Sequence, residues 1–297
     1  MNRVSRILEE KILEIENDTL HGANGLSVQA LELLKMAALE GENGSVLRDV
    51  ACRLAKARPM MASVFNIANA LLWFLEDHED SEVSQWCDRM ALSMKRANET
   101  AITKGAESLP ESGRVLTHSN SSMVRDTLMS AKEMGKSLDI VCMEARPGQE
   151  GEVLARTLCE AGFHVELIVD AAMGLALEHV DVVMVGADGI GTFGLVHKVG
   201  TKPLALMAKE TSRSLLCIAT SYKCWPIGVS IPEEPPKKEE EIVERAGCID
   251  GFNRYFDITP LEWIDRVVTG KGVLAGVQAV SSCALGRLHP LLRSPSI

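Results

Sequence analysis

Apolar residues recur every three or four positions along the first third of the chain, which is the spacing of amphipathic helices. In residues 1–17 they are Val4, Ile7, Leu8, Ile12 and Ile15. The same spacing predicts helices over residues 26–40, 42–57, 60–76 and 81–107, with Gly and Pro residues at the joins. Because the alternation typical of strands is absent before about Arg114, the sequence predicts a helical N-terminal domain over residues 1–108.

The pattern changes after a linker-like segment at residues 107–113. Short runs of apolar, β-branched residues then alternate with helical stretches. The expected strands cover residues 114–117, 138–143, 163–169, 180–185 and 215–219, and the expected helices cover residues 120–135, 149–161, 171–177 and 203–210. This alternation is typical of a mostly parallel sheet with right-handed crossovers. The sequence therefore predicts an α/β fold, with the sheet in a C-terminal domain over residues 114–297.

Two later segments complete this domain. Residues 231–241, with the sequence IPEEPPKKEEE, are rich in proline and charge, and we interpret them as a solvated loop rather than a binding motif. A helical stretch and short strands are expected within residues 253–279, where they would close the sheet.

Composition narrows the possible functions. Hydrophobic residues make up 46% of the 297 residues and charged residues 24%, which is typical of a soluble globular protein. The formal net charge of −10 argues against direct nucleic-acid binding, which needs a basic surface. We find no apolar run long enough to span a bilayer and no signal-peptide pattern, so we expect a cytoplasmic protein that does not bind membranes.

The cysteines and histidines indicate neither a metal site nor a cofactor. None of the 8 cysteines forms a C-x-x-C pair, and no histidine cluster has the spacing of metal ligands. Most of the cysteines lie in apolar stretches, so we expect buried, reduced thiols.

Polar residues follow the expected strands at the ends where parallel sheets bind ligands. His118, Arg146, Asp170 and Asp188 follow the first four strands, Lys198 follows soon after Asp188, and residues 220–223 (TSYK) follow the fifth strand. Guanidinium and ammonium groups bind phosphate, and carboxylates bind sugar hydroxyls or move protons. These residue types predict a site for a phosphorylated, hydroxylated ligand.

Two glycine motifs compete as the phosphate-binding element. The G-x-G-x-x-G pattern at residues 189–194 follows the fourth strand, whereas a dinucleotide fingerprint follows the first strand and opens directly into a helix. We therefore reject a dinucleotide cofactor. The segment KVGTKP at residues 198–203 is the better candidate, because it starts a helix whose free N–H groups and two lysines would face an anion.

Several motifs together resemble the translation initiation factor 2B alpha/beta/delta family. In the α/β part they are LTHSNSSMV (116–124), EARPGQEG (144–151), VGADGI (185–190) and HKVGTKPLALMAK (197–209), and elsewhere they are HGA (21–23), ARPM (57–60) and NRYFDITP (253–260). That family also contains methylthioribose-1-phosphate isomerase and archaeal ribose-1,5-bisphosphate isomerase. The resemblance implies a helical N-terminal domain, a Rossmann-like C-terminal domain, and homo-oligomers that are dimers or larger.

The same resemblance suggests where catalysis would occur and where this chain departs from the family. In the isomerases, a Cys in the first strand-end motif and the Asp of G-A-D interconvert aldose and ketose phosphates. This sequence keeps Asp188 but has Ser119 at the Cys position, and an unassisted hydroxyl does not ionise near neutral pH. His21 replaces an Arg that the isomerases commonly have, and Phe193 and His197 stand where asparagines are expected. We expect Cys142 to be a core residue rather than a relocated catalytic thiol.

These arguments define the candidate site. The catalytic candidates are Asp188 and Ser119. The candidate ligand-binding residues are His21, Gly22, Ala23, Arg58, His118, Ser119, Arg146, His197, Lys198, Gly200 and Thr201.

Three functions compete. The first, which we favour, is binding of a phosphorylated sugar or nucleotide with a diverged or absent isomerase activity. The second is an aldose–ketose isomerase of the ribose-1,5-bisphosphate isomerase type that uses Asp188 as acid and base, with His118 or His197 in place of the thiol. The third is a non-catalytic initiation-factor subunit that acts through oligomer contacts on an initiation-factor partner.

Overall fold

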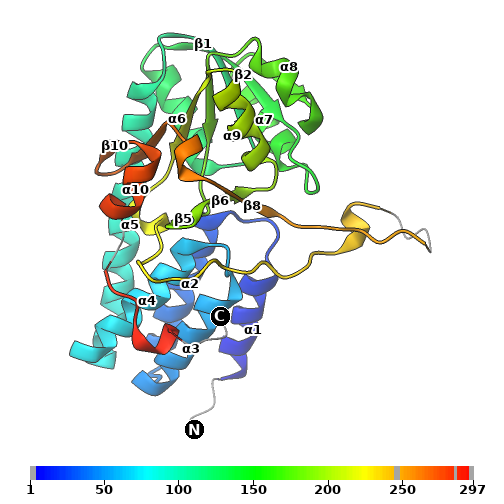
Figure 1. The fold of residues 1–297 in the computed structure, drawn as a ribbon. Coiled ribbons are helices and arrows are strands. Elements are labelled where there is room, and N and C mark those ends of the chain that lie inside the picture. Colours follow the sequence, from blue (N-terminus) through cyan, green and yellow to red (C-terminus); the bar gives the residue numbers. More distant parts are fainter. Residues whose placement is uncertain (1–4, 244–247, 284–285, 294–297) are drawn as a thin grey trace.

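The computed structural model describes residues 5–243, 248–283 and 286–293, with the side chains of 281–283 left aside. The N-terminal part is a bundle of helices, drawn in blue and cyan in Figure 1. Its members are α1 (Arg6–Asn17), α2 (Ala23–Leu39), α3 (Gly44–Ala57), α4 (Ala62–Asp77) and α5 (Val83–Ser108). These helices confirm the predicted positions, although the expected first helix begins in residues 1–4, outside the described residues.

Sequence features explain where these helices begin. The Asn43 side chain accepts hydrogen bonds from the backbone N–H groups of Ser45 and Val46, which satisfies donors at the start of α3. The Ser5 hydroxyl accepts the N–H of Leu8 in the same way at the start of α1.

The C-terminal part contains a sheet in the order β10-β9-β7-β4-β1-β2-β3. The strands are β1 (Ser112–His118), β2 (Ser137–Met143), β3 (Val165–Ile168), β4 (Val182–Val185), β7 (Ser214–Ile218), β9 (Arg266–Thr269) and β10 (Gly272–Leu274). All pairs are parallel except β9 with β10. The helices are α6 (Ser122–Glu133), α7 (Glu150–Glu160), α8 (Met173–Leu177), α9 (Thr201–Glu210) and α10 (Gly276–Cys283). This arrangement confirms the predicted mostly parallel α/β fold.

The strand order also fixes the position of a crevice. The chain moves outward from β1 to β2 and β3, then returns to place β4 on the other side of β1. Connections that leave in opposite directions open a crevice beyond the carboxyl ends of β1 and β4, where α/β proteins bind ligands. The segments after these strands are residues 119–122 and 186–188.

A second, antiparallel sheet was not predicted. Its strands β5 (Gly189–Gly191), β6 (Gly194–Lys198) and β8 (Phe256–Thr259) pair in the order β5-β6-β8. The glycine motif at residues 189–194 is therefore a hairpin rather than a loop. Gly194 has φ +138°, and a Cβ there would lie 2.6 Å from the carbonyl oxygen of Thr259, so this turn requires glycine. The motif opens into a strand, which agrees with rejecting a dinucleotide fingerprint.

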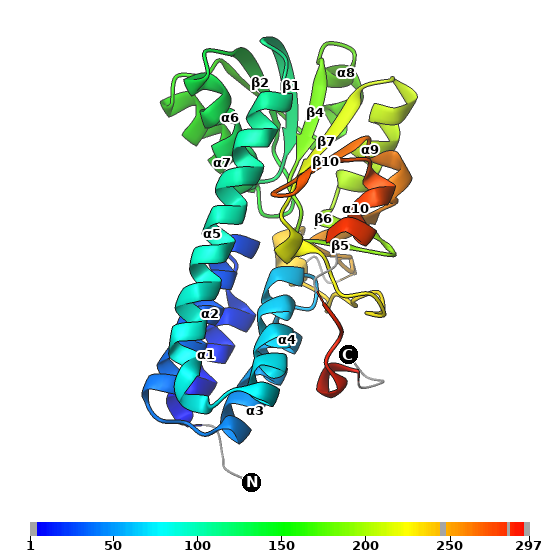
Figure 2. The ribbon, with the colours of Figure 1, turned by 90° about the vertical axis from the view of Figure 1, so that its left-hand side faces the viewer.

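Helix α5 belongs to both parts of the molecule, as Figure 2 shows from the side. Its first half contributes Val83, Trp86 and Met94 to the core of the bundle, and its second half contributes Ala101 and Ala106 to the core beneath the sheet. The boundary between the two hydrophobic cores thus lies within α5, before the predicted domain boundary at residue 108. Leu288 and Leu292, expected in the C-terminal domain, pack in the bundle core. Within the described residues, no helix is both long and apolar enough to cross a membrane.

Candidate functional site

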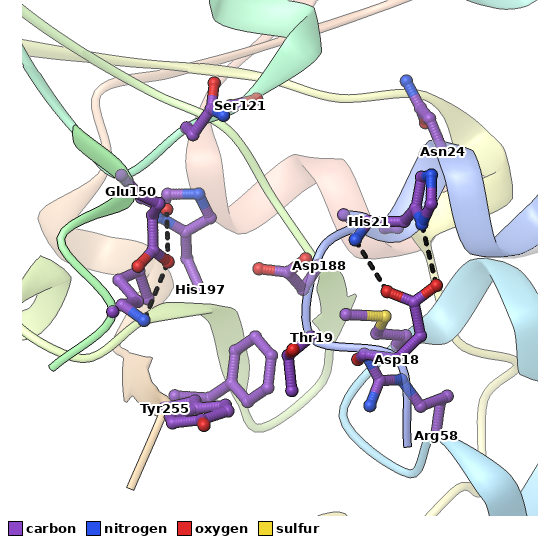
Figure 3. Close-up of a pocket in the computed structure, with 18 of the residues that line it drawn as sticks. Asp18, Thr19, His21, Asn24, Arg58, Ser121, Glu150, Asp188, His197 and Tyr255 are labelled. Carbon is purple, nitrogen blue, oxygen red and sulfur yellow. Dashed lines mark hydrogen bonds and ion pairs between the residues drawn. The ribbon is translucent and has the colours of Figure 1, made fainter. Parts of the chain in front are cut away.

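A cavity of about 450 Å³ lies where the bundle meets the carboxyl ends of β1 and β4. Its wall includes the loop between α1 and α2, the residues after β1 and β4, the end of β6, and a segment from the second half of the chain. In Figure 3, Asp188 lies near the middle, between Glu150 and His197 on one side and His21 and Asp18 on the other.

The cavity gathers most of the predicted site residues but not all of them. The predicted residues in its lining are His21, Gly22, Ala23, Arg58, Ser119, Asp188, His197 and Lys198. His118, Arg146, Gly200 and Thr201 are not among the lining residues. We expected the polar residues after the parallel strands to lie together. This is so for the residues after β1 and β4, and only in part for those after the other strands.

The α1–α2 loop is held by Asp18, which the sequence analysis missed. Its Oδ1 accepts the backbone N–H groups of Leu20 and His21, both at 2.8 Å, and its Oδ2 lies 2.7 Å from Nδ1 of His21. Burial opposes the charge of Asp18, but these hydrogen bonds and one from Gln29 outweigh it and lower the pKa of the carboxyl. The imidazole of His21 is thus oriented at the cavity wall.

Arg58 holds the start of the same loop through hydrogen bonds from its guanidinium. Its guanidinium donates to the carbonyl oxygens of Glu16, at 3.0 Å, and of Asp18. Its Nε is buried without a hydrogen-bond partner within the described residues. Arg58 therefore combines a place in the cavity wall with a structural role at the end of α1.

Lys198 is neutralised within the protein by Glu150. The ammonium of Lys198, whose side chain is 7% exposed, lies 2.7 Å from Oε1 of Glu150, and the Ser119 hydroxyl donates to the same oxygen at 3.4 Å. Ser119 has φ +70°, an uncommon conformation for a residue other than glycine. Glu150 was missed, although its place in the first turn of α7 was visible in the sequence.

Asp188 is held by its backbone. Its N–H donates to the carbonyl oxygen of Val196, and its carbonyl oxygen accepts the N–H of Ala62, both at 2.9 Å. Burial raises the pKa of its carboxyl to about 6, even though Lys223, Lys198 and Arg58 favour the charged form. A carboxyl with this pKa exchanges protons near neutral pH.

Lys223 lines the cavity and belongs to the polar segment after β7, but it was not among the predicted site residues. The residue is 4% exposed, and burial lowers the pKa of its ammonium while the nearby charge of Asp188 raises it. Within the part of the chain that the structure describes, its ammonium has no ion pair within 4 Å. Only its position after a strand could have identified it.

The predicted anion site at the start of α9 is occupied by a side chain of the protein. The N–H groups of Gly200 and Lys202 donate to Oδ2 of Asp257, at 2.8 and 3.0 Å. Asp257 lies on β8, and burial raises the pKa of its carboxyl to about 6. These two N–H groups therefore stabilise the fold.

His118 and Arg146 also have structural contacts. Nε2 of His118 donates to the carbonyl oxygen of Val199 at 2.8 Å, and its ring is fully buried. The guanidinium of Arg146 is exposed and lies 3.4 Å from the carbonyl oxygen of Glu241. Asp170 accepts the backbone N–H groups of Ala145 and Arg146, so it holds the loop after β2.

The proline- and charge-rich segment reaches the cavity, so our interpretation of it as a solvated loop was wrong for Lys237 and Glu241. Both residues line the cavity together with Tyr255. The Tyr255 hydroxyl donates to Oε1 of Glu241 at 2.6 Å, and the ammonium groups of Lys198 and Lys237 each lie 4.9 Å from the centre of its ring. Contacts with residues far along the chain position this segment, and such contacts leave no recognisable pattern in the local sequence.

The described cysteines form no disulfide, and Cys142 is a buried core residue as expected. Burial raises the pKa of its thiol to about 12. Cys159 and Cys248 are exposed, contrary to the general expectation, and the side chain of Cys283 lies outside the described residues. Among the described residues, no group of three or more His, Cys, Asp and Glu side chains could hold a metal ion.

Comparison with known proteins agrees with this fold. The model of the Initiation factor 2 subunit family matches residues 19–276. Ribose 1,5-bisphosphate isomerase of Methanocaldococcus jannaschii is 32% identical over 281 residues, covering 90% of this chain and 91% of that protein.

Two solved structures show the same fold. A crystal structure of the translation initiation factor eIF-2B of Pyrococcus horikoshii superimposes with a TM-score of 0.83 at 27% identity, covering 93% of this chain and 99% of that one. A chain of the tetrameric eIF2B-beta2-delta2 complex from C. thermophilum is similar in fold alone, with a TM-score of 0.72 at 16% identity, covering 95% and 96%. The family match, the identity and the shared architecture lead to one conclusion: this chain belongs to the Initiation factor 2 subunit family.

Proposed function

We propose that the chain binds a phosphorylated sugar in the cavity between the bundle and the sheet. The observation that carries the proposal is the buried ammonium of Lys223, which lines the cavity and has no ion pair within 4 Å among the described residues. A buried charge is costly unless an opposite charge compensates it. A phosphate group in the cavity would supply that charge.

The remaining lining suits the sugar portion of such a ligand. Ser119, Ser121, Asn24 and Asn120 supply hydroxyl and amide groups that both donate and accept hydrogen bonds. A volume of about 450 Å³ is within the usual range for small-molecule sites. A relative at 32% identity is named for a phosphorylated ribose, which supports the same ligand class.

The experiment is calorimetric titration of the protein with ribose 5-phosphate, AMP and inorganic phosphate. We expect a sugar phosphate to bind, and Lys223→Met to weaken it by about tenfold or more, because the variant removes a charged hydrogen-bond donor. Lys202→Met is the matched control, since Lys202 is exposed and outside the cavity lining. A folded wild-type protein that binds none of the three ligands contradicts the proposal.

A second candidate is an aldose–ketose isomerase, which the pKa of Asp188 near 6 favours. In the open-chain aldose, the Asp188 carboxylate would take the proton from the carbon beside the carbonyl, and the C–H electron pair would form the enediol as the carbonyl oxygen gains a proton. Return of the proton to the former carbonyl carbon, with loss of the neighbouring hydroxyl proton, gives the ketose. Formation of ribulose 5-phosphate from ribose 5-phosphate, followed by NMR, tests this step. In ribose 1,5-bisphosphate the C1 oxygen is esterified, so the bond between C1 and the ring oxygen breaks and the ring oxygen gains the proton, while loss of the C2 proton gives an enol phosphate that becomes ribulose 1,5-bisphosphate when C1 is protonated. Absence of turnover of both substrates rejects this candidate.

A further inference from the structure

His197 is a buried imidazole whose hydrogen bonds determine where its proton lies. It is on β6 and 3% exposed, and its Nδ1 lies 3.0 Å from Oγ1 of Thr201. The Thr201 hydroxyl has one hydrogen, which it donates to the carbonyl oxygen of Lys198 at 2.6 Å. The Thr201 oxygen must therefore accept the second hydrogen bond, so Nδ1 of His197 carries a proton.

The imidazole is neutral in this environment. Burial holds its pKa well below the ordinary value, and the nearby His118, Lys223 and Lys198 lower this pKa further. A neutral imidazole that is protonated on Nδ1 has an unprotonated Nε2. This nitrogen can accept a hydrogen bond but cannot donate one.

Nε2 of His197 lies at the edge of the sheet that faces the cavity. His197 lines the cavity, and no other side chain or backbone group is hydrogen-bonded to Nε2 in the part of the chain that the structure describes. A Cβ at Gly186, just after β4, would lie 3.2 Å from Nε2 and would overlap Ser121. The nitrogen therefore lies beside the end of β4, close to Ser121.

We propose that His197 is a specificity-determining residue that accepts a hydrogen bond from a ring or chain hydroxyl of the bound sugar phosphate. This inference rests on the proposed function and adds which group of the ligand the position selects. A phosphate or carbonyl oxygen opposite Nε2 would bring two acceptors together, whereas a hydroxyl supplies the missing donor. A ligand without that hydroxyl would leave the buried nitrogen unpaired, and such losses discriminate strongly between related ligands.

His118 differs from His197 in the hydrogen-bonding role of its Nε2. Nε2 of His118 donates to Val199 within the fold, and the ring is outside the cavity lining. His118 and His197 thus present opposite polarity at Nε2, and of these two rings only that of His197 lines the cavity.

The first test needs no ligand. In ¹⁵N spectra of the histidine-labelled protein near neutral pH, we expect His197 to be neutral, with a protonated Nδ1 and a bare Nε2. Thr201→Val removes the acceptor of Nδ1 and should move the proton toward Nε2, while Thr201→Ser keeps the hydroxyl and should preserve the wild-type signal. A wild-type ring protonated on Nε2 overturns the inference.

The second test measures selectivity by calorimetry with ribose 5-phosphate and its 2-deoxy and 3-deoxy analogues. We expect at least one deoxy analogue to bind the wild type and Thr201→Ser about tenfold or more weakly than ribose 5-phosphate, and the gap to shrink in Thr201→Val. If the affinity of the wild type for each analogue is within about threefold of its affinity for ribose 5-phosphate, the role of His197 is rejected while the proposed function stands. If none of these three sugar phosphates binds, the hydroxyl contact is rejected, and the proposed function is rejected as well when AMP and inorganic phosphate also fail to bind. The spectra still decide the tautomer in either case.

Discussion

Asp188 is the cavity carboxyl whose pKa the structure raises to about 6. Its native pKa of about 6 lies above the ordinary value of 3.8, because burial outweighs the attraction of Lys223. The protonated carboxyl is therefore the form that the fold prefers. Its favourable contribution to stability is fully present below pH 3.8 and is lost as the pH rises through 6.

Asp188→Asn should accordingly stabilise the protein at pH 8, by about 2 kcal/mol, because the variant removes a charge that the cavity disfavours. At pH 4 the two proteins should have nearly equal free energies of unfolding, since the wild-type carboxyl is then mostly protonated when folded. Urea unfolding at both pH values is the measurement. If the protein is an isomerase, the same variant loses turnover while gaining stability. A loss of stability at pH 8 would show that the Asp188 charge is needed by Lys223.

At the scale of elements, the turn between β6 and α9 is tightly constrained. Gly200 has φ +104°, its N–H is bound by Asp257, and a Cβ at this position would lie 3.0 Å from Nε2 of His118. The turn fixes Lys198 and Thr201, and through Thr201 it fixes the ring of His197. Its geometry therefore controls several lining groups together.

We expect Gly200→Ala to lower the free energy of unfolding by about 2–3 kcal/mol, from the strained φ together with the close approach to His118. Gly228→Ala is the matched control, because Gly228 has φ +96° but no atom within 4 Å of the added Cβ. The Gly228→Ala variant should lower the free energy of unfolding by about 1 kcal/mol. Equal losses in the two variants, measured by urea unfolding, would mean that the His118 contact is unimportant.

At the scale of the whole molecule, the helical bundle positions groups of the sheet. The Asn66 amide of α4 donates to the carbonyl oxygens of Tyr222 and Cys224, both at 2.8 Å, on either side of Lys223. The N–H of Ala62, at the start of the same helix, donates to the carbonyl oxygen of Asp188. The bundle thus sets the separation of Asp188 and Lys223.

Asn66→Ala should therefore weaken sugar-phosphate binding as well as stability. The matched variant is Asn69→Ala, because Asn69 lies on the same helix and binds the backbone of Arg287 and His289 instead. Each variant removes two buried hydrogen bonds and should cost about 1–3 kcal/mol of unfolding free energy. Only Asn66→Ala should also reduce ligand affinity, by severalfold in calorimetry. An equal loss of affinity in both variants would indicate a general loosening of the fold.

The sequence by itself determined the bundle helices, the strands of the parallel sheet and two of the strand ends that line the cavity. Helices such as α3 and strands such as β4 follow local apolar patterns, which depend only on residues near one another in the chain. The strand-end motifs identified Ser119, Asp188 and Lys198, because parallel strands bring their carboxyl ends to one edge.

Only the tertiary structure decided how the charges are paired and which groups face the cavity. Glu150 meets Lys198, Asp257 takes the helix N–H groups that looked free for a phosphate, and Lys237 reaches the cavity from a segment resembling a loop. These partners are far apart in the chain, so no local pattern encodes their contact. Long-range packing brings them together, and the cost of burying unpaired polar groups then determines which donor meets which acceptor.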